Sequence, residues 1–371
     1  MSVLSFIVRA VDRLRRQLAP DRTDSLTVAS VLKDILNGER FVAVDVGAAN
    51  GILPHWHLLD GAAQLYQIEP REEACRELQQ ENQAAGLSDS RRVIQAAVAG
   101  TEGERILHVS NVPTGTSLLP HDPEASLDCV DYVDSGYLFP ITERIIETRR
   151  LSSIMIDAKE HRAELVKLDI QGAELEALQG LGGDRLRTLL GAELEIGMHS
   201  FYPREARFPA IHQFMEDRGL ELFDMRVARV RRPWRGSHGA YESEVFLVDE
   251  NTPTVAARLW EIDAIYFRKK SLILSEGDAG TVRRMVVAYA VYNFYSEAHA
   301  LIGKAERAGI LTEGEAQKLE QSIVDLHHVA CYRPWLADSP FWRAVRRFGA
   351  RFAPRNSPRW CQHMYQAYPN G

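Results

Sequence analysis

The sequence predicts an α/β fold, in which a largely parallel sheet carries helices on both faces and an α-helical extension follows. Two observations support this prediction. Between residues 41 and 268, short apolar runs alternate with segments of helical periodicity, which is typical of strands joined by crossover helices. After Lys270 the strand-like runs stop, and only helical patterns remain. A chain of 371 residues has room for one large domain and an appendage.

Composition and charge exclude several classes of protein. A hydrophobic content of 45% with 26% charged residues is ordinary for a globular chain, and the net charge of −7 argues against a nucleic-acid partner. The four cysteines have no paired spacing, which indicates a reducing compartment and no structural zinc site. Neither a signal-peptide pattern nor the ~18 apolar residues of a membrane-spanning helix is present, so we expect a cytoplasmic protein.

Seven apolar runs are the expected strands of the sheet. They cover residues 41–46, 63–70, 91–99, 164–170, 186–196, 220–227 and 262–269. Helical patterns over 71–85 and 209–218 each end at a glycine, as helices commonly do. The stretches 109–140 and 231–258 lack a clear period. We interpret both as long loops that shape an acceptor site.

Three helices are expected in the extension. The first covers 280–308 and ends at Gly309, and the second begins with a capping box formed by Thr312 and Glu315 and continues to about residue 331. The third begins at Ser339, followed by a proline at the first helical position.

A loop of small residues follows the first expected strand, in the stretch "DVGAANG" from Asp45 to Gly51. Small residues let a ligand approach the backbone, and α/β proteins bind nucleotides at the carboxyl ends of strands. The second strand ends in Glu69, where a carboxylate is placed to accept hydrogen bonds from ribose hydroxyls. The loop and Glu69 together favour a nucleoside-containing cofactor over a simple turn.

The spacing within the loop distinguishes between cofactors. The dehydrogenase fingerprint G-x-G-x-x-G and the phosphate-binding G-x-x-x-x-G-K-[ST] are both absent. Asp45, two residues before the first glycine, would repel a pyrophosphate but suits a cationic group such as the ammonium of methionine. The loop therefore favours S-adenosylmethionine over NAD.

A second acidic stretch, "KLDIQGAELEALQG", begins at Lys167. Asp169 ends the fourth expected strand, so it lies at the same sheet edge as Asp45 and Glu69. Asp169 and Glu174 are either site carboxylates or acids that stabilise the dipole of the following helix, and both interpretations stay open. Two acids do not make the oxygen-rich set that a divalent cation prefers, so we expect no metal.

The stretches "DVGAANG", "QIEP" and "KLDIQGAELEALQG" together resemble the FkbM-family methyltransferases, over roughly residues 41 to 270. The resemblance implies a seven-stranded class I, Rossmann-like methyltransferase sheet and S-adenosylmethionine as methyl donor. It further implies a set of cofactor-binding residues. They are Asp45, Gly47 and Gly51 for the methionine part, Glu69 for the ribose, Ala97 beside the adenine, and Ala48 and Asn50 as further residues of the binding loop.

The same resemblance implies O-methylation of a hydroxyl, on a sugar, a glycan or a secondary metabolite. An alcohol acceptor needs a base within hydrogen-bond reach. Asp169 and His199 are the best candidates, and Glu174 and Glu195 are weaker ones. His199 is equally compatible with a surface loop, while His55 and His57 are better explained as residues on a helix face.

Both ends of the chain are basic and amphipathic. Residues 341–371 contain six arginines and no acid, and apolar residues between 4 and 18 share one helix face opposite arginines. Such helices either lie on anionic membranes or pack on the domain or on a second subunit. Peripheral contact with the inner membrane face and a homo-oligomer both stay open.

The sequence divides into an N-terminal helical segment (1–38), a methyltransferase domain (39–270) and a helical extension (271–371). Two rival functions remain. One is a non-catalytic binding or assembly protein that keeps the fold, and the other is an NAD(P)-dependent oxidoreductase on a similar sheet.

Overall fold

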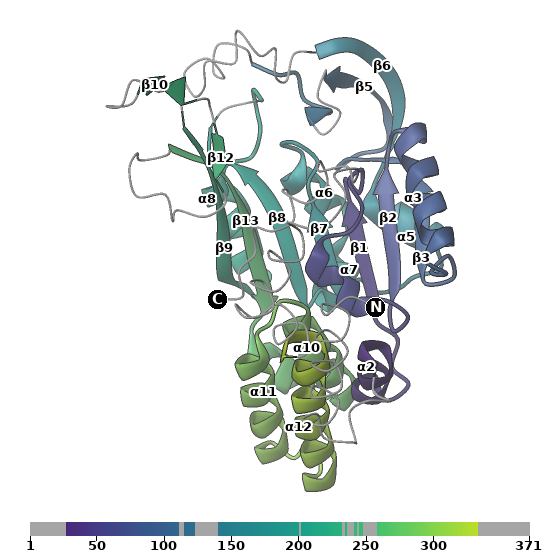
Figure 1. Ribbon diagram of the computed structural model, residues 1–371, viewed down its shortest axis with the longest axis vertical. Coiled ribbons are helices and arrows are strands. Elements are labelled where there is room, and N and C mark those ends of the chain that lie inside the picture. Colours follow the sequence, from purple (N-terminus) through teal and green to yellow (C-terminus); the bar gives the residue numbers. More distant parts are fainter. Residues whose placement is uncertain are drawn as a thin grey trace, which may run out of the picture.

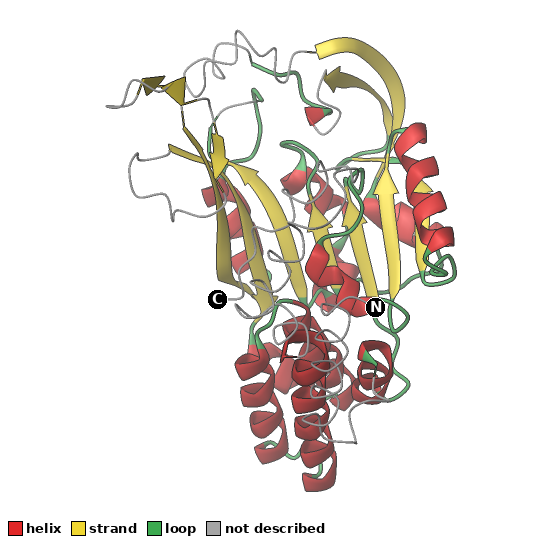
Figure 2. Ribbon diagram, viewed as in Figure 1, coloured by secondary structure: helices red, strands yellow, loops and turns green. Residues whose placement is uncertain are grey.

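The computed structural model describes residues 27–110, 115–122, 140–199, 202–231, 234–235, 241–242, 245–247 and 258–332. At its centre is an eight-stranded sheet with the order β12-β9-β13-β8-β7-β1-β2-β3 (Figures 1 and 2). Its strands are β1 (Val42–Val46), β2 (Gln64–Glu69), β3 (Arg91–Gln95), β7 (Leu165–Leu168), β8 (Gly191–Gly197), β9 (Leu220–Arg231), β12 (Val245–Leu247) and β13 (Arg258–Arg268).

The connectivity of this sheet is that of a class I methyltransferase. Strands β3, β2, β1, β7 and β8 are parallel neighbours, while β13 lies antiparallel between β8 and β9. The predicted fold class, a seven-stranded sheet with helices on both faces and a helical extension, is therefore confirmed. Strand β12 pairs with β9 and adds an eighth strand. It lies in the stretch 231–258, which we expected to be irregular.

Alternating residues along each strand separate the sheet into two faces with different helices. One face packs on α5 (Leu151–Asp157), α6 (Glu174–Gly180), α7 (Gly183–Thr188) and α8 (Phe208–Glu216). The other face, which we call the loop face, carries the 3₁₀ helix η1 (Pro54–Leu59), α3 (Glu72–Ala84) and the helical extension. The loop after β1 lies above this second face.

The helical extension shares a core with the loop face. It consists of α9 (Lys270–Glu276), α10 (Ala279–Val291), α11 (Tyr295–Arg307), α12 (Glu313–His327) and a final π-helical turn, η4 (His328–Tyr332), and it packs with α2 (Val28–Leu36). Figure 1 places this bundle at the end of the sheet where the parallel strands begin. Buried residues of α2, η1, α10 and the sheet form one continuous hydrophobic cluster.

A smaller sheet lies beyond the carboxyl ends of the parallel strands (Figure 1). Its order is β4-β6-β5, with β4 (Ala97–Val98), β5 (Gly103–Ser110) and β6 (Pro140–Arg149). The expected third strand is therefore split, since β3 joins the main sheet and β4 joins the small one. The small sheet was not predicted, because an irregular stretch of sequence separates its two long strands, β5 and β6.

Four further expectations either need correction or concern residues outside the described ranges. The helix expected over 280–308 is two helices, because α10 ends before Asn293, whose φ of +64° is left-handed. A hairpin of β10 (Trp234–Arg235) and β11 (Tyr241–Glu242) also interrupts the predicted second loop. The amphipathic ends and the helix expected from Ser339 lie outside the described residues. Among the helices that are described, none has the length and apolarity to cross a membrane.

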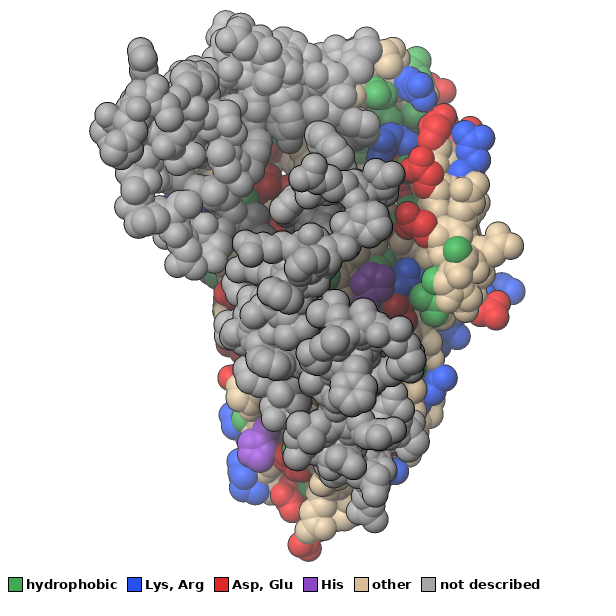
Figure 3. All heavy atoms as spheres, in the orientation of Figure 1, with side chains coloured by type: hydrophobic (Ala, Val, Ile, Leu, Met, Phe, Trp, Pro, Cys, Tyr) green, Lys and Arg blue, Asp and Glu red, His purple; other side chains and the backbone are tan. Residues whose placement is uncertain are grey.

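Opposite charges are interspersed on the described surface, as Figure 3 shows beside the edge of the sheet and along the bundle. On α3, for example, Arg76 lies within 4 Å of Glu72 (3.7 Å) and Glu73 (3.8 Å). Exposed pairs of this kind contribute little to stability.

Candidate active site

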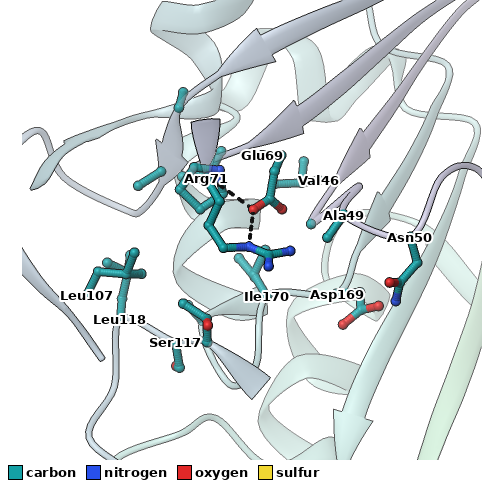
Figure 4. Close-up of a pocket in the computed structure, with 17 residues that line it drawn as sticks. Val46, Ala49, Asn50, Glu69, Arg71, Leu107, Ser117, Leu118, Asp169 and Ile170 are labelled. Atoms are coloured by element: carbon teal, nitrogen blue, oxygen red, sulfur yellow. Dashed lines mark hydrogen bonds and ion pairs between the residues drawn. The ribbon is translucent and has the colours of Figure 1, made fainter. Parts of the chain in front are cut away.

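A cavity opens at the carboxyl edge of the sheet, between the loop after β1 and the small sheet (Figure 4). The loop contributes Gly47, Ala49 and Asn50 to its wall, and the end of β2 contributes Glu69. The turn after β7 contributes Asp169. The structure therefore brings the glycine loop and both predicted edge carboxylates to one place.

Close backbone contact joins the loop to the turn after β7. Gly47 has a φ of +80°, and a Cβ built on it would lie 1.8 Å from the carbonyl oxygen of Asp169. Only glycine fits there without displacing backbone. Gly51 also has a positive φ, but its nearest neighbour would be 3.8 Å away. It does not line the cavity, and neither does the buried Ala48.

Three amide groups of the loop are used in hydrogen bonds within the protein. The N–H groups of Gly47 and Ala48 both donate to the carbonyl of Ile68, at 3.0 and 3.3 Å, and Gly51 N–H donates to Ala48 at 2.9 Å. A pyrophosphate site needs such amides pointing at the ligand. This arrangement disfavours the dinucleotide alternative.

Glu69 presents its carboxylate to the cavity from the last position of β2. Its Oε1 accepts hydrogen bonds from the backbone N–H (3.1 Å) and Nε (2.8 Å) of Arg71. Figure 4 shows the Arg71 side chain extending across the cavity. Sequence reasoning missed Arg71, although its place two residues after an edge carboxylate is a signal that was available.

Small and apolar side chains form the remaining walls. Ala97, predicted to flank an adenine, lines the cavity together with Val98, Leu107 and Leu118. An apolar slot beside a carboxylate that can accept ribose hydroxyls fits the chemistry of S-adenosylmethionine. Glu69 would hold the ribose, and the alanine-lined wall would hold the adenine ring.

Asp45 lies below the cavity instead of on its wall. It is fully buried within β1, and Lys167 Nζ approaches its Oδ1 to 3.2 Å. The same ammonium lies 3.4 Å from Oδ2 of Asp169. Burial lowers the pKa of Lys167, but the two carboxylates outweigh it and raise the pKa overall. Asp45 thus already has a cationic partner within the protein, and its predicted contact with the cofactor stays a prediction.

Asp169 is the partly exposed carboxylate of this group, with 33% of its side chain accessible. Burial raises its pKa, but Lys167 and hydrogen bonds from Glu195 and Gln171 reverse the shift, so the pKa is lowered. Gln171 Nε2 donates to Asp169 at 3.3 Å and to Glu195 at 3.2 Å, which ties the two carboxyl groups together. Burial and the neighbouring Asp169 raise the pKa of Glu195 well above its usual range.

Residues 45–222 match the methyltransferase FkbM domain. The chain contains an FkbM methyltransferase domain. The match implies S-adenosylmethionine as the methyl donor. It covers the end of β1, the glycine loop, both edge carboxylates and strands β2 to β8. The helical extension from α9 onward lies outside the matched residues.

Three solved structures are similar to this chain at low identity. An uncharacterized protein from Listeria monocytogenes serotype 4b is 11% identical, over 80% of this chain and 97% of that one, with a TM-score of 0.29. A putative tRNA (m1A22) methyltransferase from Streptococcus pneumoniae is 12% identical, over 84% and 99%, with a TM-score of 0.28. An rRNA methylase from Streptococcus thermophilus is 13% identical, over 66% and 98%, with a TM-score of 0.26.

These scores carry no conclusion about substrate or mechanism. A comparison with curated protein sequences finds no match.

Glu174, a predicted catalytic residue, supports the turn of the FkbM domain that carries Asp169. It is buried at the start of α6 and does not line the cavity. Its Oε1 accepts hydrogen bonds from the N–H groups of Ile170 and Gly172, both at 3.1 Å. Burial raises the pKa of Glu174 to about 7. This geometry is that of a helix-start acid, which was the alternative interpretation of the sequence.

The predicted histidines lie in different places. His199 follows β8, and its Nε2 lies 2.6 Å from the carbonyl oxygen of Leu259, away from the cavity wall. Burial lowers the pKa of His199. His57 lies on the surface beside Asp60, while His55 points inward and hydrogen-bonds Glu193 at 3.0 Å.

Within the described ranges, no three His, Cys, Asp or Glu side chains are arranged to hold a metal ion. The expectation of a metal-free site remains an expectation.

Proposed function

We propose that the FkbM domain transfers a methyl group to a hydroxyl, on a sugar, a glycan or a secondary metabolite. S-adenosylmethionine supplies an electrophilic methyl group, so the protein has to align the acceptor and remove its proton. The observation that carries the proposal is Asp169, a partly exposed carboxylate on the cavity wall.

Asp169 is assigned the role of proton acceptor. A general base must be ionised and within reach of the acceptor, and Asp169 is both partly exposed and charged at neutral pH. Lys167 and Gln171 hold its two oxygens in place, at 3.4 and 3.3 Å. A hydroxyl that enters the cavity beside this carboxylate can donate its proton as the methyl group is transferred.

Additional carboxyl groups continue from Asp169 along the loop face. Asp263 of β13 stands opposite Glu195 of β8, and Glu261 follows two residues away on the same side. All three carboxyl groups have raised pKa values, chiefly because of burial. Carboxyl groups bind the hydroxyls of polyols well, which supports a polyhydroxylated acceptor.

The test is a methyl-transfer assay with the purified protein, S-adenosylmethionine and a panel of hydroxylated acceptors, detecting S-adenosylhomocysteine. Asp169→Asn keeps the shape of the side chain and removes the base. We expect it to lower kcat by a factor of about 10² to 10⁴ while the affinity for S-adenosylhomocysteine stays within about threefold.

His199→Asn is the matched control, since His199 lies away from the cavity. It should keep wild-type kcat. An Asp169→Asn variant with wild-type turnover would reject the assigned base. Methylation confined to amine or thiol acceptors would reject the hydroxyl as the target.

The partners and the location of the protein are also proposed and not established. A hydroxylated small molecule or glycan remains the proposed acceptor, and the cytoplasm the proposed compartment. Homo-oligomer formation and peripheral membrane contact rest on the amphipathic ends, which lie outside the described residues.

A further inference from the structure

A polar network connects the helical extension to the segment that follows the cofactor loop. Tyr292, the C-cap residue of α10, donates a hydrogen bond from its hydroxyl to Glu193 Oε2 at 2.9 Å. The same hydroxyl accepts a hydrogen bond from Trp56 Nε1 at 3.1 Å. The hydroxyl thus links a central strand of the sheet, β8, to the helix η1.

Glu193 is the centre of this network. It is 1% exposed, and it accepts hydrogen bonds from Tyr292, from His55 Nε2 at 3.0 Å, and from Arg226 Nη1 at 3.1 Å. Burial raises the pKa of Glu193, but the hydrogen bond and charge of His55, together with Arg226, lower it overall. The carboxylate is therefore held ionised in the core, where every one of its partners matters.

Only a short stretch of chain separates this network from the cavity. His55 and Trp56 lie in η1, which begins at Pro54, and Asn50 on the cavity wall precedes this helix by four residues. Trp56 is fully buried against α10, and the ring of His55 packs 4.8 Å from the ring of Tyr292. The first turn after the cofactor loop is thus fixed on one side by the sheet and on the other by the extension.

We propose that Tyr292 is a positioning residue for cofactor binding, by which the helical extension holds the loop Gly47–Leu53 in its binding conformation. The extension is then part of the methyl-transfer machinery, although it lies outside the residues that match the FkbM domain. The proposal rests on binding of S-adenosylmethionine at the cavity and does not depend on which atom of the acceptor is methylated.

A matched control lies one turn earlier on the same helix. Tyr289 is also buried, and its ring also packs on Phe267, with centroids 4.9 Å apart against 5.4 Å for Tyr292. Among the described residues, its hydroxyl has no hydrogen-bond partner. Tyr289→Phe and Tyr292→Phe therefore remove the same atom from similar surroundings, but only the second breaks the link to η1.

The experiment has two readouts on the full-length protein. Amide hydrogen exchange without ligand reports opening of the segment 47–59, and calorimetric titration with S-adenosylhomocysteine reports cofactor affinity. For Tyr292→Phe we expect exchange in 47–59 to become about tenfold faster and the dissociation constant to rise about fivefold or more. Tyr289→Phe should match the wild type in both readouts.

A purely structural role for Tyr292 makes a different prediction. In that case Tyr292→Phe lowers the melting temperature but leaves exchange in 47–59 and the dissociation constant unchanged, and the proposal is overturned. Equal effects of the two variants would overturn it as well. If the wild type bound no S-adenosylhomocysteine, the assigned methyl donor would be wrong, while the exchange data would still decide whether Tyr292 holds the loop.

Discussion

The two faces of the central sheet differ in chemistry, although the same strands build both. On the face covered by α5 to α8, side chains such as Val44, Leu168 and Leu194 are fully buried and apolar up to the carboxyl edge. On the loop face, strands β1, β2 and β7 begin apolar and become polar or charged toward that edge. In β7, for example, Leu165 is followed on this side by Lys167.

The difference indicates that the two faces of the sheet have different roles. The apolar face supplies packing, which depends on burial and tolerates exchange of similar side chains. The loop face keeps buried charges near the cofactor, and each buried charge is costly unless its partner is present. Variants on the loop face should therefore show strong pH dependence, whereas variants on the apolar face should not.

Among the loop-face variants, Lys167→Met should have the largest effect on the free energy of unfolding. It leaves Asp45 fully buried without its cationic partner, so we expect a loss of about 3–5 kcal/mol in the free energy of unfolding at pH 7. Without Lys167, the pKa of buried Asp45 is higher in the folded variant than in the unfolded chain. The loss of stability should therefore grow as pH rises, because ionisation of Asp45 then opposes folding. Urea denaturation at several pH values measures it.

Asp45→Asn in the Lys167→Met background serves as the control. The double variant should recover most of the lost stability, since no buried charge remains unpaired. If the single variant lost less than about 1 kcal/mol, the ion pair would not govern the loop face.

Gly47→Ala should have the next largest effect, and Gly51→Ala is its matched partner. Both glycines have a φ near +80°, so both variants incur the strain of a left-handed residue, about 1–2 kcal/mol. Only Gly47→Ala also places a Cβ against the backbone of Asp169, which adds about 1–3 kcal/mol. We expect it to abolish measurable S-adenosylhomocysteine binding, while Gly51→Ala stays folded and binds. Similar titration curves for the two variants would contradict this account.

Glu174→Gln should have a smaller effect that depends on pH. The pKa of Glu174 is raised from 4.5 to about 7 in the folded protein. Its contribution to stability is therefore present below about pH 4.5 and is lost as pH rises through 7, by about 1–3 kcal/mol. Gln keeps an oxygen for the N–H groups of Ile170 and Gly172 but cannot ionise.

The glutamine variant should accordingly lose less stability than the wild type between pH 5 and pH 8, as measured by thermal denaturation. Glu164, whose pKa burial also raises to about 7, is present in both proteins and cancels in the comparison. Parallel stability curves for the two proteins would show that Glu174 is not protonated on folding.

Local patterns in the sequence predicted much of the sheet and its edge. Glu69 ends an apolar run directly before Pro70, and Asp169 ends one three residues before Gly172. Parallel strands carry these ends to one edge of the sheet. The catalytic role of Glu174 stays a prediction, and spacing alone could not tell whether this acid faces the cavity or the backbone of its own turn. Its hydrogen bonds to Ile170 and Gly172 decide that question.

Pairings between distant strands could not be predicted from the sequence. Lys167 faces Asp45 because β1 and β7 are neighbours in register, and 121 residues separate them in the chain. The link between Tyr292 and Trp56 likewise depends on how the extension docks. The break at Asn293 was missed because a single asparagine in a helical pattern is a weak signal, even though asparagine tolerates a positive φ.

Ser117 joins the small sheet to the turn beside Asp169. Its backbone bridges His108 of β5, and its hydroxyl donates to the carbonyl of Gln171 at 2.6 Å. For protein engineering, this contact marks a place where the segment between β5 and β6 could be replaced. A replacement segment between β5 and β6 that keeps Ser117 would be held in position beside the cavity by this hydroxyl. Grafting such segments could then alter the choice of acceptor, while the glycine loop and the buried pair of Asp45 and Lys167 beneath it stay unchanged.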